Sequence, residues 1–159
     1  SLIMVDYFWQ GITQLDAETA NGAILDMVEW EKNYFDYYED TTMVETAAIA
    51  ENYWRYHTII RKNPTVRMIK EYIAQGYPVI APFYGKAIGN PNYSGDGPLY
   101  HMMVIKGYKG DKFITNDPGT KRGADYMYDA EHLLSVIHDW NGGDVQNGEP
   151  YILILEPRG

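Results

Sequence analysis

The hydrophobic pattern of the chain changes near residue 76. Before that point, apolar residues recur at helical spacing in segments that start near residues 2, 18, 42 and 64. After it, apolar runs at 77–84, 99–108, 112–116 and 151–155 indicate strands, and a helix is expected at 129–138. Helices followed by mostly antiparallel strands predict an α+β fold. The 159 residues fit one domain around one core.

The opening segment is the most apolar of the predicted helices. Residues 2–10 are apolar on nearly every side, with Asp6 and Gln10 as the exceptions. A helix of this kind belongs inside a fold. A natural terminus is usually polar and frayed, and the chain starts at Ser1 instead of a methionine. We therefore expect residues 1–159 to be a single domain that lacks its first helical turn.

Composition excludes several classes of protein. The hydrophobic content of 45% is enough for a buried core, which argues against a disordered chain. A net charge of −9 repels phosphate backbones, so nucleic acid is not expected as a partner. No apolar run is long enough for a membrane span. Composition indicates neither the cellular location nor the oligomeric state.

Neither a disulfide nor a metal centre is expected. The chain contains no cysteine, which excludes disulfides and thiolate metal ligands within it. His57, His132 and His138 do not have metal-ligand spacing. The expected chemistry therefore needs no metal and no organic cofactor.

Strands 99–108 and 112–116 form a predicted hairpin that brings a histidine to an acid. With a three-residue turn, Gly107 pairs with Asp111, and His101 then lies directly opposite Asp117. Opposed side chains share a face, with Cβ atoms about 4.5–5.5 Å apart. A carboxylate in that position can hold an imidazole in one tautomer and stabilise its charged form. A slip of one residue would bring Asn116 or Pro118 opposite His101 instead.

A histidine–acid pair lacks only a nucleophile. Ser94 and Ser135 have no motif around them, and no G-x-S-x-G occurs. The start of the first helix would suit the missing group, because the helix field and a nearby imidazolium both favour a thiolate. The long loop at 85–98 precedes His101, and Tyr93 and Tyr100 beside it are candidates for binding a peptide. Residues 90–95 would form a cleft wall or a moving flap.

Three segments carry a resemblance to a known family. These are YHMMVIKGY at 100–108, FITNDPG at 113–119 and GYPVI at 76–80. Together with the apolar first helix, they resemble the papain-like cysteine peptidases that process double-glycine leaders in bacteriocin exporters, the peptidase C39-like family, and its stand-alone bacterial relatives. The resemblance covers roughly residues 1–155. The family's cysteine, which begins the first helix a few residues before a Ser-Leu-x-Met-like stretch, and its upstream glutamine do not occur in this chain.

The resemblance implies a papain-like fold and a thiol peptidase mechanism. His101 would be the general acid/base and Asp117 its orienting partner, with Asn116 as the fallback. The partner would be a peptide or protein substrate. Two alternatives stay open, namely an inactive module that binds a peptide without cutting it and a transglutaminase-like acyl transferase. A cysteine within about five residues before Ser1 would favour an enzyme.

Overall fold

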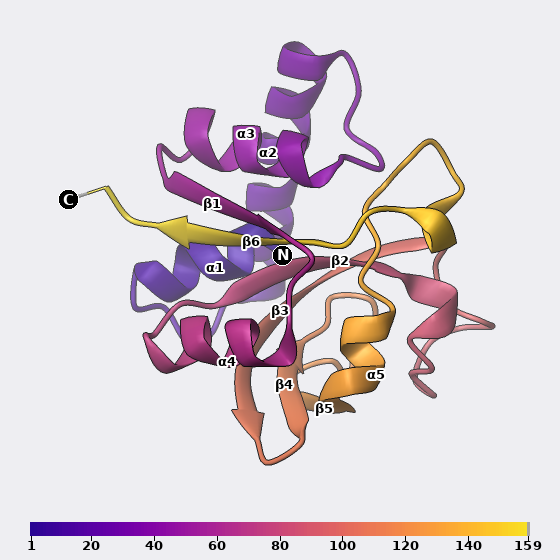
Figure 1. Ribbon diagram of the computed structural model, residues 1–159. Helices are drawn as coiled ribbons and strands as arrows, with labels where there is room; N and C mark the ends of the chain where they lie inside the picture. Colours follow the sequence, from indigo (N-terminus) through magenta and orange to yellow (C-terminus); the bar gives the residue numbers. More distant parts are fainter. Residues whose placement is uncertain (159) are drawn as a thin grey trace.

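The computed structural model describes residues 1–158, whose strands form a single antiparallel sheet (Figure 1). The six strands lie in the order β1-β6-β2-β3-β4-β5. Their bounds are β1 His57–Lys62, β2 Val79–Tyr84, β3 Tyr100–Lys109, β4 Lys112–Asn116, β5 Tyr126–Asp129 and β6 Tyr151–Glu156. The expected α+β class, with helices first and antiparallel strands after, is confirmed. β1 and β5, the two edge strands, were not predicted from the sequence.

Helices cover both faces of this sheet (Figure 1). Their bounds are α1 Leu2–Trp9, α2 Ala17–Phe35, α3 Met43–Asn52, α4 Val66–Ala74 and α5 Ala130–Ser135, with short 3₁₀ turns at Gly85–Ala87 and Val145–Asn147. Side chains of α1, α2 and α3 join one hydrophobic cluster, and those of α4 and α5 join the other. Within residues 1–158, no helix has both the length and the apolar character needed to cross a bilayer.

Strict alternation along the central strands separates the two cores. On β2, Val79 and Ala81 face α4 and α5, whereas Ile80 between them faces α1 and α3. On β3, Met103 faces the first side and Val104 the second. Successive side chains of a strand point to opposite faces. His101, two residues before Met103, therefore lies on the α4 and α5 side of the sheet.

Helix starts follow capping chemistry. A capping box is present at α3, where Thr42 accepts a hydrogen bond from the Glu45 amide and Glu45 accepts one from the Thr42 amide. Asn63, which precedes Pro64, does not cap α4. Its φ of 52° places it in the left-handed region, and Thr65 caps α4 by accepting the Met68 amide.

The predicted register of the β3–β4 hairpin is wrong. The loop contains two residues, so that Lys109 pairs with Lys112, and a bulge shifts the register between Ile105 and Gly107. A two-residue loop with glycine first suits the right-handed twist of the flanking strands. Beyond the bulge, Val104 pairs with Asn116. His101 is thus not directly opposite Asp117.

Candidate active site

His101 and Asp117 are nevertheless in direct contact. His101 is the second residue of β3, and Asp117 follows the last residue of β4. Continuing the observed pairing would place Asp117 opposite Met103, which makes it the diagonal neighbour of His101 on the same face. The His101 Nε2 atom lies 2.7 Å from Asp117 Oδ1, with side chains 10% and 0% exposed respectively. A buried carboxylate thus holds an imidazole that reaches the surface.

Several donors keep the Asp117 side chain ionised. Its Oδ1 atom also accepts the Gly119 amide at 2.8 Å, and its Oδ2 atom accepts the Tyr93 hydroxyl at 2.6 Å. Burial alone would raise the pKa of Asp117, but the hydrogen bonds from His101, Tyr93 and Gly119 outweigh it and lower the pKa to about 2. Asp117 is therefore a full negative charge at neutral pH, available to stabilise an imidazolium.

The depressed pKa predicts a specific loss of stability in acid. A carboxylate with a folded-state pKa of about 2 and an unfolded value of 3.8 stabilises the fold above pH 3.8, and this contribution disappears as the pH falls toward 2. We expect it to amount to about 2 kcal/mol. Urea unfolding of the native protein and of Asp117→Asn at pH 5 and pH 2.5 would measure it. Equal pH dependence in the two proteins would contradict the prediction.

Gly119 lies against the histidine–aspartate pair. A Cβ atom at this position would come within 2.8 Å of His101 Cε1 and 3.1 Å of Asp117 Oδ1. The Gly119 amide also closes a short turn onto the Asp117 side chain, a common use of aspartate two residues before a turn amide. The close approach of this backbone therefore needs a residue without a side chain.

Gly119→Ala should displace the imidazole and weaken the His101–Asp117 contact. We expect the free energy of unfolding to fall by about 1–3 kcal/mol, as for other crowded buried positions. Gly22→Ala is the matched control, because a Cβ there meets nothing within 4 Å on α2. It should raise stability by about 0.5–1 kcal/mol through higher helix propensity. Denaturant titration of both variants tests the pair of expectations, and an unchanged or more stable Gly119→Ala protein would contradict the first.

The cap residue of α1, Ser1, is tied to the residue that follows His101. The Ser1 hydroxyl donates to the carbonyl of Met102, the residue after His101, at 2.8 Å. The far end of the helix is held by Trp9, whose Nε1 donates to the Leu155 carbonyl at 3.1 Å. The start of α1 is thereby fixed beside β3. Since Asp117 occupies Nε2 of His101, the other ring nitrogen, Nδ1, remains for a second partner.

The structure brings Asp117, and not Asn116, to His101. Asn116 pairs with Val104, and its side chain accepts the Asp125 amide at 3.3 Å. Tyr93 joins the pair, with its ring edge-on to the His101 ring at a centroid distance of 5.6 Å. Its hydroxyl binds Asp117, which ties the 85–98 loop to the site.

Tyr100 lies apart from the pair. Its hydroxyl donates to the Thr41 carbonyl at 2.9 Å and approaches Asp139 Oδ1 at 3.0 Å. Asp139 in turn accepts the Met43 amide at the start of α3. Tyr100 therefore links the sheet to α3, on the face opposite His101.

Comparison with known proteins identifies the relatives of this chain. The family model of the Peptidase C39 like family matches residues 1–142. The chain belongs to this family. Among solved structures, the C39-like chain is similar to a protein from Bacillus anthracis named as a C39-like peptidase, with 12% identity and a TM-score of 0.46. The match covers 70% of this chain and 56% of the other, so it spans little more than half of that protein. The comparison with curated proteins gives no match.

An apolar groove in the C39-like chain begins at the start of α1. Its volume is about 820 Å³, and it runs between α1, the 11–15 loop and α2, with Ser1, Lys106 and Asn116 on its wall. Large apolar side chains along it are exposed to solvent, among them Phe8 at 48% and Ile24 at 46%. Solvent-exposed apolar clusters of this kind mark binding surfaces. The groove therefore begins at the end of α1 where the Ser1 hydroxyl binds the carbonyl of Met102.

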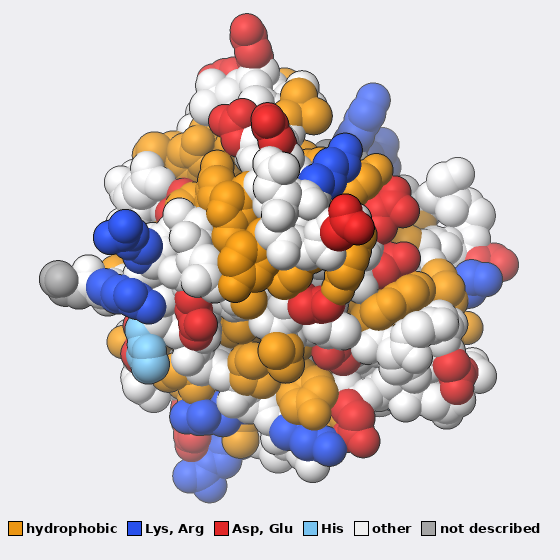
Figure 2. Space-filling view, turned by 90° about the horizontal axis from the view of Figure 1, so that it is seen from above, with side chains coloured by type: hydrophobic (Ala, Val, Ile, Leu, Met, Phe, Trp, Pro, Cys, Tyr) orange, Lys and Arg blue, Asp and Glu red, His pale blue; other side chains and the backbone are white. Residues whose placement is uncertain are grey.

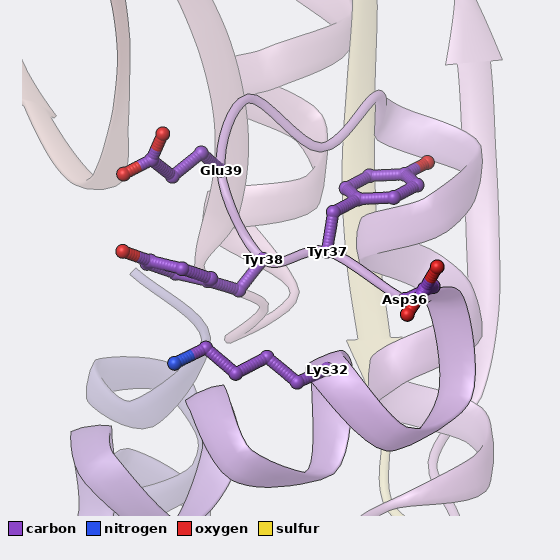
Figure 3. Close-up of a pocket in the computed structure, with 5 residues that line it drawn as sticks. All are labelled: Lys32, Asp36, Tyr37, Tyr38 and Glu39. Carbon is purple, nitrogen blue, oxygen red and sulfur yellow. The ribbon is translucent and has the colours of Figure 1, made fainter.

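A second hollow, of about 420 Å³, lies at the C-terminal end of α2 (Figure 3). All five lining residues are exposed, and Lys32 Nζ lies over the Tyr38 ring at 4.6 Å from its centroid. It contains none of the predicted site residues.

The face on the side of α2 and α3 shows acidic side chains scattered between hydrophobic groups (Figure 2). Over residues 1–158, no three His, Cys, Asp or Glu side chains gather as a metal site.

Sequence reasoning missed two polar residues that support Asp117. These are Asn90 in the 85–98 loop and Tyr128 on β5, both buried. The Tyr128 hydroxyl donates to Asp117 Oδ2 at 3.0 Å. No local motif marks either residue, because their contact with Asp117 depends on the order of the strands.

Proposed function

We propose that this C39-like chain is the body of a cysteine peptidase domain, with the nucleophilic cysteine a few residues before Ser1. His101 is the general acid/base and Asp117 orients it. The observation that carries the proposal is the 2.7 Å contact between His101 Nε2 and Asp117 Oδ1, with Ser1 bound to the backbone carbonyl of Met102, the residue after His101. Membership of a peptidase-like family supports it.

The chemistry follows from these positions. The cysteine thiol gives its proton to Nδ1 of His101, and the field of α1 favours the resulting thiolate. The thiolate attacks the scissile carbonyl carbon, and backbone amides at the start of the helix stabilise the oxyanion. His101 then protonates the leaving amine as the C–N bond breaks. Water, deprotonated by His101, hydrolyses the thioester and regenerates the thiol.

The α1–α2 groove supplies the binding surface in this proposal. It starts at Ser1, so residues of a substrate that flank the scissile bond can extend along it. Its wall is mainly apolar, with Ile3, Met4 and Met27 among the lining residues. An apolar wall selects peptide segments with apolar side chains. The same groove also favours the second candidate function, a module that binds a peptide without cutting it.

Ile24→Asp should weaken peptide binding, because it places a charge on the groove wall. We expect KM to rise about tenfold with little change in kcat, corresponding to the loss of one buried apolar contact. Leu25→Asp is the matched control, since Leu25 is the next residue of α2, is 59% exposed and does not line the groove. Steady-state kinetics of both variants on an apolar peptide would test this. Equal KM values for both variants would exclude the groove as the binding surface.

Completing the chain tests the proposal directly. The protein would be produced from its gene with the residues that precede Ser1, treated with iodoacetamide and analysed by mass spectrometry for a labelled cysteine. Its products on a peptide, with and without an added amine, would be weighed. Hydrolysis that labelling abolishes supports a peptidase, and an amine adduct would indicate a transferase. If no cysteine precedes Ser1 closely, or if the labelled and unlabelled proteins bind without cleavage, the peptidase proposal fails in favour of the binding module.

A further inference from the structure

The second oxygen of Asp117 is surrounded by neutral donors that the proposed mechanism does not use. Oδ1 faces His101 and the Gly119 amide, whereas Oδ2 accepts the hydroxyls of Tyr93 at 2.6 Å and Tyr128 at 3.0 Å. The Asn90 amide nitrogen lies 3.4 Å from the same oxygen. Five donors thus converge on one carboxylate. Two or three donors to a carboxylate can already lower its pKa strongly, so five exceed what its ionisation alone requires.

The direction of each hydrogen bond in this group is fixed by its neighbours. The Asn90 Oδ1 atom accepts the Asn92 backbone amide at 2.9 Å, which identifies it as the acceptor end of the side chain. The other end, Nδ2, therefore faces Tyr128 and donates to its hydroxyl oxygen at 2.7 Å. With its oxygen already accepting, the one hydroxyl proton of Tyr128 must point to Asp117. Tyr128 is thus a fixed donor and cannot turn away.

Both phenols remain protonated in this position. Burial and the neighbouring Asp117 raise the pKa of Tyr128. Burial, followed by the hydrogen bond to Asp117, likewise raises the pKa of Tyr93. A carboxylate whose second oxygen is saturated by such donors keeps its negative charge and a single orientation. Its Oδ1 atom is then held toward the imidazole.

We infer that Tyr128 and Tyr93 are positioning residues, which hold Asp117 ionised and directed at His101, with Asn90 fixing the direction of the Tyr128 donor. This rests on the proposed function of His101 and Asp117. It assigns Tyr93 a role other than direct substrate binding. It also makes β5 part of the site, although β5 contributes no residue that touches the imidazole.

Tyr128→Phe and Tyr93→Phe remove one hydroxyl each and keep the rings. In the 159-residue chain, we expect each substitution to raise the pKa of the Asp117 carboxyl by about one, because a donor to a charged group is lost. Carbon-detected NMR titration of the aspartate carboxyl measures this. In the complete protein, kcat should fall about tenfold in each variant while KM stays constant. A substrate-binding role of Tyr93 would instead raise KM.

Tyr126→Phe is the matched control. Tyr126 lies on β5 with its ring 4.7 Å from that of Tyr128, and the hydrogen bond at this residue uses its backbone carbonyl. It should leave both the Asp117 titration and kcat unchanged. The inference is overturned if Tyr93→Phe and Tyr128→Phe titrate like the control, and Tyr93→Phe alone decides it should Tyr128→Phe not fold. Lack of cleavage by the complete protein would contradict the proposed function, whereas the titration result would still test the positioning of Asp117 by the two tyrosines.

Discussion

His101→Ala is expected to abolish peptide hydrolysis by the complete protein. The imidazole accepts the thiol proton and later protonates the leaving amine, so its removal affects both halves of the reaction. We expect kcat to fall by roughly 10⁴-fold or more. The fold should persist, because Asp117 keeps its donors from Gly119, Tyr93 and Tyr128. Single-turnover kinetics, with circular dichroism as the check on folding, would measure both effects.

His57→Ala provides the comparison for this variant. His57 lies on β1 at the edge of the sheet, is exposed, and has its Nε2 atom 3.9 Å from a carboxylate oxygen of Glu156. Its removal should leave kcat and KM within error of the native values, as for most surface substitutions. A His101→Ala protein with the native rate would rule out the assignment of the general acid/base, whatever the effect of His57→Ala.

Asp117→Ala is expected to lower both activity and stability. The loss in kcat should be about two to three orders of magnitude, because the imidazole loses its orientation and the charge that stabilises its protonated form. The unfolding free energy should also fall by on the order of 3 kcal/mol, since the donors from Tyr93, Tyr128 and Gly119 would be left without an acceptor. Kinetics and urea denaturation on the same variant would separate the two effects.

Asp117→Asn and Asn116→Ala refine this expectation. An amide at position 117 keeps an oxygen for His101, so Asp117→Asn should be the more active of the two position-117 variants. Asn116 contacts the Asp125 amide and not His101, so Asn116→Ala should reduce kcat by less than about threefold. A larger loss from Asn116→Ala than from Asp117→Ala would assign the orienting role to Asn116.

The site pair was predicted from the sequence although its register was not. The expected pairing placed His101 opposite Asp117, and the observed pairing places Asp117 two residues away along the strand. A difference of two residues keeps every side chain on the same face, whereas a difference of one reverses it. The histidine side chain is long enough for its Nε2 atom to reach Asp117 Oδ1 across the remaining diagonal. The two-residue turn and the bulge after Ile105 are what the sequence pattern did not reveal.

The rest of the site depends on contacts between distant segments. Asn90 and Asp117 are 27 residues apart, and only the placement of the 85–98 loop over the end of β3 joins them. β5 has four residues, too few for alternation to identify a strand. Alternation alone places the Tyr100 side chain on the face of the sheet opposite His101, because successive side chains of a strand point to opposite faces. Helices were predicted more accurately, since their caps and apolar spacing are local signals.

The position of β6 has a consequence for the synthesis of this protein. β6 is the last of the six strands of this sheet in chain order, yet it lies between β1 and β2 and pairs with both. Until residues 151–156 emerge, β1 therefore has no neighbour in the sheet. The hydrophobic clusters on the two faces of the sheet also lack the side chains of β6 until then. Sheets closed by such distant pairing assemble slowly. The nascent chain is thus expected to need residues 151–156 before it can acquire a working site, and a product that stops before them should be prone to aggregation.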